Sequence, residues 1–152
     1  MKRLMPILLA GLMLLSVLPA SGDMAGGLLM PVSAPSGLRL TALSLRESRG
    51  DGWCSPAAGN VFVVVRFRAE NGTGSELSIS SVVDFEVWAD GMRVSWSQGA
   101  SMACAPSLEC TISAGRQAEG ELAWEVPASW QTLEIRYRPG ITIVLTRQDM
   151  WR

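Results

Sequence analysis

The sequence predicts an all-β fold, a sandwich of about eight or nine short antiparallel strands. Apolar and polar residues alternate with a period of two through most of the chain after residue 37, which is the period of a β-strand. No segment has a convincing period of 3.6 residues, the mark of an amphipathic helix. Turn residues (Gly, Pro and Asn) separate the alternating runs at short intervals.

Length and composition indicate a single globular domain. The chain has 152 residues, of which 48% are hydrophobic and 18% charged, enough to bury one core. The formal net charge of −1 gives no reason to expect nucleic acid as a partner. The sequence contains no histidine, so it lacks the commonest general base and metal ligand. We therefore expect no metal or cofactor and no enzymatic activity.

The N-terminus has the pattern of a signal peptide, which we assign to residues 1–22. Lys2 and Arg3 precede an uncharged apolar run over residues 4–18, and small residues follow up to Gly22. We expect cleavage there and export from the cytoplasm. The alternative is an uncleaved anchor, the one way in which we expect this chain to contact a membrane. The apolar run is short for that role, because a spanning helix needs roughly 20 apolar residues.

The remaining chain divides into a flexible tether, residues 23–36, and a domain, residues 37–148. Gly, Pro and Ser dominate the tether without any period. The first domain strand slips phase after Ala42, which indicates a bulge or two short strands. The run 60–71 is the predicted central strand. Its odd positions from 61 to 69 are all apolar, whereas its even positions from 62 to 70 begin apolar and end charged.

Seven further strands follow from the same alternation. Asp90-Gly91 is a strong hairpin signal between two of them. Alternation places Met92, Trp96 and Trp124 inward and Trp88 outward, whereas Trp130 falls in a loop. A long loop is expected over residues 98–109. The nine predicted strands are 37–46, 60–71, 76–80, 84–90, 92–96, 110–112, 119–126, 132–138 and 141–146.

Five motifs of the domain carry a family resemblance. They are G-N-V-F-V-V-V-R-F-R-A-E-N at 59–71, L-S-I-S-S at 77–81, D-F-E-V-W-A-D-G at 84–91, A-G-R-Q-A-E-G-E-L-A-W-E-V-P at 114–127 and L-E-I-R-Y-R-P at 133–139. In this order they resemble a large bacterial family of secreted immunoglobulin-like domains of unknown function, similar in fold to the immunoprotective extracellular antigen domain. The resemblance covers about residues 38–147 and implies an immunoglobulin-like β-sandwich outside the cytoplasm, often tethered to the envelope. It supplies no catalytic residues.

The three cysteines allow one disulfide and leave one thiol over. Disulfides persist in the oxidising environment that an exported protein meets. Proximity favours Cys104–Cys110, which would close a short loop worth roughly 2 kcal/mol. Cys54 is the alternative partner, and a Cys54–Cys104 bond would close a longer loop worth roughly 4 kcal/mol.

The outward positions suggest a contact surface. Arginines recur at strand spacing on outward positions. If their strands neighbour the acidic strand in one sheet, they would form cross-strand ion pairs, and they could also form a cationic patch for an anionic envelope polymer. Trp88 also falls on an outward position, and exposed tryptophans suit carbohydrate or protein contact. The carboxylates Asp84, Glu86 and Asp90 share one strand face, which is usually a solvated face and less often a glycosidase or calcium site. The predicted contact residues are Arg66, Arg68, Trp88, Arg136 and Arg138.

The function that we expect is an exported, non-enzymatic immunoglobulin-like module for contact with a protein or an envelope ligand. One alternative is a structural subunit of an envelope assembly, held by an uncleaved N-terminal anchor. Another is a small carbohydrate-active hydrolase that uses the outward carboxylates. A flat carboxylate face would argue against the hydrolase, which needs a concave pocket with convergent polar groups.

Overall fold

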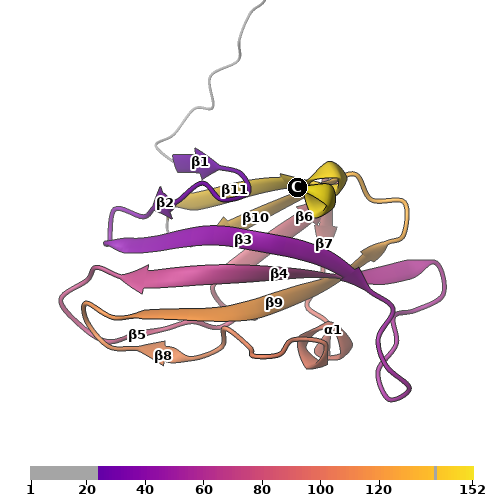
Figure 1. Cartoon of the computed structure of the whole chain (residues 1–152), viewed down its shortest axis with the longest axis horizontal. Helices are drawn as coiled ribbons and strands as arrows, with labels where there is room; N and C mark the ends of the chain where they lie inside the picture. Colours follow the sequence, from indigo (N-terminus) through magenta and orange to yellow (C-terminus); the bar gives the residue numbers. More distant parts are fainter. Residues whose placement is uncertain (1–23, 139) are drawn as a thin grey trace, which may run out of the picture.

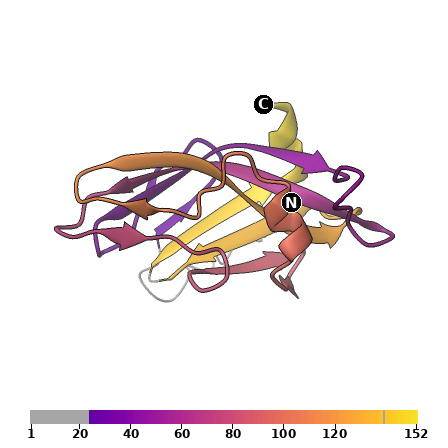
Figure 2. The same cartoon turned by 90° about the horizontal axis from the view of Figure 1, so that it is seen from below.

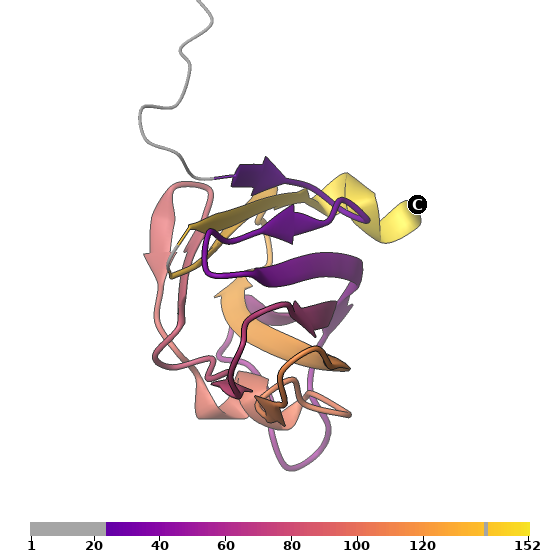
Figure 3. The same cartoon turned by 90° about the vertical axis from the view of Figure 1, so that its left-hand side faces the viewer.

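Two β-sheets pack face to face in the computed structural model, which describes residues 24–138 and 140–152 (Figures 1 and 3). One sheet has the strand order β2-β3-β4-β9, the other β1-β11-β10-β6-β7, and β5 and β8 form a separate pair. The predicted signal peptide, residues 1–22, lies outside the described residues. The strands are β1 (Met24–Gly26), β2 (Val32–Ser33), β3 (Leu38–Ser48), β4 (Asn60–Asn71), β5 (Leu77–Ser78), β6 (Phe85–Ala89), β7 (Met92–Val94), β8 (Thr111–Ile112), β9 (Gln117–Pro127), β10 (Thr132–Tyr137) and β11 (Ile141–Thr146).

The predicted β-sandwich is confirmed, and β4 lies at the centre of its sheet, between β3 and β9. The odd-numbered side chains of β4 from Val61 to Ala69 are apolar, point into the space between the sheets and are almost completely buried. Burying a Val or Phe side chain stabilises a fold by roughly 1.5–3 kcal/mol. One face of β4 therefore anchors the core.

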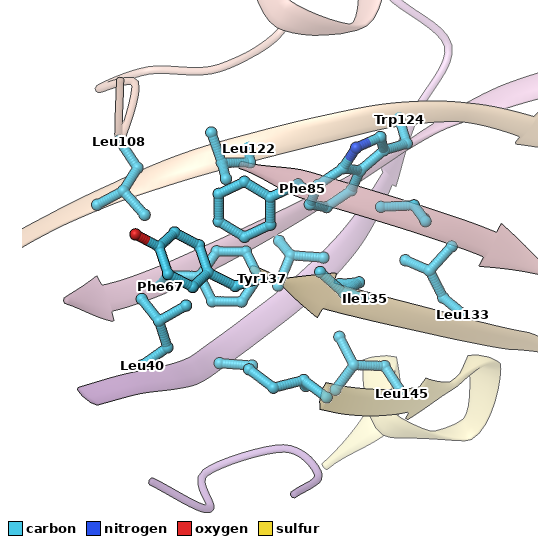
Figure 4. Close-up of a cluster of buried hydrophobic side chains, with 14 of the residues drawn as sticks. Leu40, Phe67, Phe85, Leu108, Leu122, Trp124, Leu133, Ile135, Tyr137 and Leu145 are labelled. Carbon is cyan, nitrogen blue, oxygen red and sulfur yellow. The ribbon is translucent and has the colours of Figure 1, made fainter. Parts of the chain in front are cut away.

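Aromatic rings from both sheets meet in the middle of that core (Figure 4). Phe85 of β6 meets the ring of Tyr137 edge-on, with centroids 5.3 Å apart. On the opposite sheet it faces Trp124 of β9 at 6.2 Å and Phe67 of β4 at 6.3 Å. Tilted and edge-on pairs add about 0.5–1.5 kcal/mol beyond their buried area. These contacts fix how the two sheets stack.

All nine predicted strands are present, as β3 to β11, and two short strands add to them. The phase slip in β3 is a bulge, since its register with β4 shifts between Ala42 and Ser44. The segment 23–36, predicted to be a flexible tether, instead contains β1 and β2. Val32 is 3% exposed and pairs with Leu40 of β3. Two or three residues are too few to display a period, so composition alone could not identify these strands.

Strand β1 also changes the predicted all-antiparallel pairing, because it runs parallel to β11 (Figure 1). The other strand pairs in the described residues are antiparallel. A parallel neighbour needs a crossover connection, and here the whole domain between β1 and β11 provides it. The segment after residue 23 is thus held in both sheets.

A five-residue helix, α1 (Gln98–Met102), lies inside the predicted loop 98–109. The Ser97 hydroxyl caps it by accepting a hydrogen bond from the Ala100 N–H at 3.3 Å. It packs on β9 and β4 (Figure 2). Its single turn is too short for a helical period, so the sequence pattern could not display it.

A 3₁₀-helix, η1 (Arg147–Trp151), ends the chain and extends past residue 148, the predicted domain end. The Asp149 carboxylate accepts hydrogen bonds from the Thr146 N–H and hydroxyl. Met150 packs against the core. Neither η1 nor α1 is long and apolar enough to cross a bilayer, and the described residues contain no other helix that is.

Two side chains differ from their predicted positions. Met92 and Trp96, expected inward, are 75% and 47% exposed. Met92 lies on the edge strand β7, and Trp96 lies beyond the end of that strand at Val94, where alternation no longer decides burial. Trp130 lies in the loop between β9 and β10, as predicted. Its side chain is nevertheless fully buried, and its indole N–H donates to Glu47 at 2.9 Å.

Candidate contact surface

The outer face of the five-stranded sheet gathers most of the predicted contact residues. The β6–β7 hairpin closes through Asp90 and Gly91, whose φ values are +49° and +80°, as a two-residue type I′ turn requires. That turn sets the register in which Trp88 lies between Arg93 of β7 and Glu134 of β10. We call this surface the Trp88 face, defined by Glu86, Trp88, Arg93, Glu134, Arg136 and Arg138.

Trp88 and Arg136 form the centre of the Trp88 face. The Arg136 guanidinium carbon lies 4.7 Å from the centroid of the Trp88 ring, which is within the range of a cation–π contact. Arg136 also pairs with Glu134 on the same strand, with 2.6 Å between Nη2 and Oε1. The indole is half-buried and Arg136 is exposed. The two planar groups together offer a flat surface with a polar margin.

A second ion-pair group borders this centre. Glu86 of β6 binds Arg138 and also lies 3.7 Å from Arg93. All three side chains are at least partly exposed, so each pair contributes little to folding stability. With three arginines and two glutamates, the Trp88 face is close to neutral.

Arg66 and Arg68 lie on the other sheet, so the predicted contact residues divide between two faces. Both guanidinium groups bind the Glu119 carboxylate of β9, at 3.0 and 2.7 Å. The hydrogen bonds from Arg68 and then Arg66 lower the pKa of Glu119. We call these three residues the Glu119 cluster. Because the Glu119 cluster lies on the four-stranded sheet, its arginines do not extend the Trp88 face.

The outward carboxylates do not converge on a common point. Asp84 accepts a hydrogen bond from the Ser80 N–H at 2.7 Å, and Asp90 accepts from the backbone N–H groups of Gln131 and Thr132. Each carboxylate therefore holds a turn or an arginine. Within residues 24–138 and 140–152, no group of three or more Cys, Asp and Glu side chains is arranged to hold a metal ion.

Trp96 is an exposed aromatic residue whose exposure strand alternation did not predict. It borders a cleft of about 360 Å³, together with Phe85, Trp124 and Arg93. The serine that caps α1 directly follows it, and that cap was the sequence signal that the β7 strand had ended. The cleft lies at the edge of the sandwich, next to the unpaired side of β7.

Two residues in the motifs that carry the family resemblance have structural roles. The side chain of Asn71 is 1% exposed, donates to the carbonyls of Ser75 and Ile112, and accepts from Thr73. A Cβ added to Gly120 of β9 would lie 2.5 Å from the Leu108 N. Asn71 thus organises a turn, and Gly120 lets the chain at Leu108 pass against β9.

The three cysteines are free thiols in the structure. Cys110 packs against the main core. Cys54 and Cys104 both pack against a smaller cluster on the opposite side of the four-stranded sheet. Burial, and next the nearby Glu121 carboxylate, raise the pKa of the Cys104 thiol to about 12. The predicted Cys104–Cys110 pairing stays a prediction.

The profile of a family described as “Domain of unknown function (DUF4352)” matches residues 34–144. No curated protein matches the sequence at a significant level. The immunoglobulin-like and antigen-domain resemblance, which is finer than this family match, stays a prediction.

Three solved structures are similar in fold. One is described as a “putative lipoprotein” from Bacillus subtilis, with 15% identity, a TM-score of 0.64 and coverage of 78% of this chain but only 39% of that one. A conserved hypothetical protein from Bacillus anthracis has 11% identity and a TM-score of 0.55, and the match covers 77% of this chain and 92% of that one. An uncharacterized β-sandwich protein from Clostridium difficile has 10% identity and a TM-score of 0.52, and the match covers 85% of this chain and 98% of that one.

Proposed function

We propose that this chain, which belongs to the DUF4352 family of domains of unknown function, is an extracytoplasmic contact module. In this proposal the domain binds a protein or an envelope polymer through the Trp88 face and catalyses no reaction. The signal-peptide pattern of residues 1–22 supports export, and the fold similarity to a protein described as a “putative lipoprotein” is consistent with an envelope location.

The observation that carries the proposal is the stacked pair of Trp88 and Arg136. Aromatic residues and arginine are the side chains that most often dominate binding energy at protein interfaces. The pair lies on an outer sheet face, whereas α1 packs on the other sheet. A partner could therefore cover the Trp88 face without displacing a helix of this domain.

Charge balance indicates which partners suit this face. Arg93, Arg136 and Arg138 are opposed by Glu86 and Glu134, so a highly anionic polymer has little net charge to attract it. A partner with a flat apolar group and a few hydrogen-bonding groups fits better, because it can stack on the indole and reach the surrounding charges. Binding to such a partner should depend weakly on salt.

The proposal is tested by partner recovery from an envelope extract. Immobilised full-chain protein is compared with Trp88→Ala, Arg136→Ala and, as a matched control on the other sheet, Arg66→Ala. All three variants remove an exposed or half-exposed side chain that takes part in an arginine contact. Circular dichroism checks that each variant keeps its fold.

We expect a partner that is recovered with the parent protein and Arg66→Ala and lost with both Trp88 face variants. Equal recovery with all four proteins would refute the Trp88 face as the contact site. A partner lost only with Arg66→Ala would instead assign contact to the Glu119 cluster.

A structural role in an envelope assembly is the second candidate, and the apolar run over residues 4–18 is the feature that favours it. N-terminal sequencing of the protein from envelope and soluble fractions separates the two candidates. A chain that starts near residue 23 supports the cleaved, soluble module. A chain that keeps its first residues and stays in the membrane fraction supports the anchored subunit.

A further inference from the structure

The small cluster outside the four-stranded sheet holds two of the three cysteines. It consists of Phe62 and Val64 of β4, Ala123 of β9 and Ala100 of α1, with Cys54 and Cys104 packed against it. Cys54 comes from the loop between β3 and β4, whereas Cys104 follows α1. Two segments far apart in the sequence, one at residue 54 and one at residue 104, thus each bring a thiol to the same apolar surface.

Both sulfurs lie against α1. The Cys54 Sγ is 2.9 Å from the position that a Cβ on Gly99 would occupy. The Cys104 Sγ donates a weak hydrogen bond to the carbonyl of Ala100, the next residue of α1, at 3.8 Å. Any side chain at Gly99 would push Cys54 away. The glycine therefore permits a close approach of the β3–β4 loop to the helix beside the second cysteine.

The backbone around each cysteine is held by hydrogen bonds. The Asp51 carboxylate accepts from the N–H groups of Trp53 and Cys54, both at 3.0 Å. Next to Cys104, the Glu121 carboxylate accepts a hydrogen bond from the Ala105 N–H at 3.0 Å. These bonds restrain the two segments in their present arrangement, which lowers the entropy cost of joining them.

We propose that Cys54 and Cys104 form the disulfide of this protein and that Cys110 is the remaining thiol. Cys110 packs against the main core, on the other side of the four-stranded sheet from Cys104, and its carbonyl accepts from the Ile79 N–H at 2.9 Å. The bond ties the β3–β4 loop, which carries the 96% exposed Trp53, to the end of α1. The loop and α1 lie toward the same end of the sandwich in Figure 1.

The bond forms by exchange with a disulfide donor, such as an oxidised dithiol oxidoreductase or glutathione disulfide. The Cys54 thiolate attacks one donor sulfur and displaces the other as a thiolate. The Cys104 thiolate then attacks the Cys54 sulfur and displaces the second donor sulfur. The two protons lost by the cysteines pass to the two donor thiolates, so the protein is oxidised and the donor reduced. A cavity of about 280 Å³ beside Cys54 gives a donor access.

The test is a linkage map of full-chain protein oxidised with glutathione disulfide. Trypsin leaves Cys54 in residues 50–66 but keeps the other two cysteines together in residues 94–116. A second, Glu-specific protease is therefore needed, because it cuts between them after Glu109. We expect a cross-link between residues 50–66 and 94–109 that disappears on reduction.

Any other map overturns the proposal. A bond between residues 94–109 and 110–116 would establish Cys104–Cys110, and a bond between residues 50–66 and 110–116 would establish Cys54–Cys110. Three unlinked thiols after oxidation would also refute it. The map is made in vitro and needs neither export nor the Trp88 face, so its failure is distinct from failure of the proposed function.

Thermal unfolding gives an independent readout. The oxidised parent protein and oxidised Cys110→Ser should both melt at a higher temperature than their reduced forms. Cys54→Ser and Cys104→Ser should melt at the same temperature with or without reductant. A redox-dependent melting temperature that survives in Cys54→Ser would contradict the assignment.

Discussion

The two outer faces of the sandwich have similar alternating sequences but different environments. On the four-stranded sheet, α1 covers the end that carries Phe62 and Val64, and ion pairs around Glu119 occupy the other end. On the five-stranded sheet, Trp88 and Arg136 stack on one another without a covering helix from the described residues. An outward apolar residue can therefore be part of a core on one sheet and an available contact on the other.

The largest expected effect tests this contrast directly. Phe62→Ala should lower the free energy of unfolding by about 3–5 kcal/mol, because the ring is fully buried beneath α1 and its loss leaves a cavity. Trp88→Ala should lower it by only about 1 kcal/mol, because the indole is half-buried and its main contact is with the exposed Arg136 guanidinium. Urea denaturation of both variants measures the difference. Similar losses would mean that the Trp88 face is also a structural surface.

The second expected effect concerns the thiol of Cys104, which packs at the end of the four-stranded sheet that α1 covers. With its pKa raised to about 12 by burial and by Glu121, Cys104 in the reduced, folded protein should carry far less thiolate at pH 8 than it does unfolded. Alkylation by iodoacetamide should then be slower by roughly a thousandfold. Mass spectrometry of timed samples, folded and in urea, measures the rate at Cys104. Equal rates would mean that α1 does not shield the thiol.

Alternation in the sequence was sufficient to predict β3 to β11, because each of these strands has one face against the core. It was also sufficient to predict that the even-numbered face of β4 becomes exposed toward the end of the strand, from Arg66 onward. It could not predict what covers Phe62, since α1 is a single turn whose contacts form only in three dimensions. The division of Arg66 and Arg136 between two sheets was equally hidden, because strand spacing carries no information about which strands are neighbours.

The third expected effect tests the contact between α1 and the β3–β4 loop. In Gly99→Ala, the new methyl group would lie 2.9 Å from the Cys54 Sγ and 3.3 Å from the Phe62 ring. We expect the free energy of unfolding to fall by about 1 kcal/mol. This is at the low end for overpacking, because the Cys54 side chain can rotate away. Urea denaturation of reduced protein measures it. Gly52→Ala is the control, because Gly52 has open space around its Cβ position, and we expect it to leave the free energy of unfolding nearly unchanged. Gly91→Ala would not serve as a control, since φ at Gly91 is +80°.

The smallest expected effect concerns the exposed end of the four-stranded face. The pKa of Glu119 is below its usual 4.5 because Arg68 and Arg66 donate hydrogen bonds to the carboxylate. A lowered folded-state pKa adds stability above pH 4.5, and that stability is lost as the pH falls through the folded-state value. Glu119→Gln should therefore melt slightly below the parent protein at pH 7, and the difference should shrink as the pH falls below 4.5.

Glu134→Gln is the matched control on the Trp88 face, where the carboxylate binds a single arginine. Melting curves of both variants from neutral to acid pH, at low and high salt, measure the comparison. A difference for Glu119→Gln that stays constant down to acid pH would contradict the ion-pair origin, because protonation of the parent carboxylate should remove it. If salt abolishes the difference, the Glu119 cluster is screened like other surface pairs, and the covered end under α1 then supplies the stability of this face.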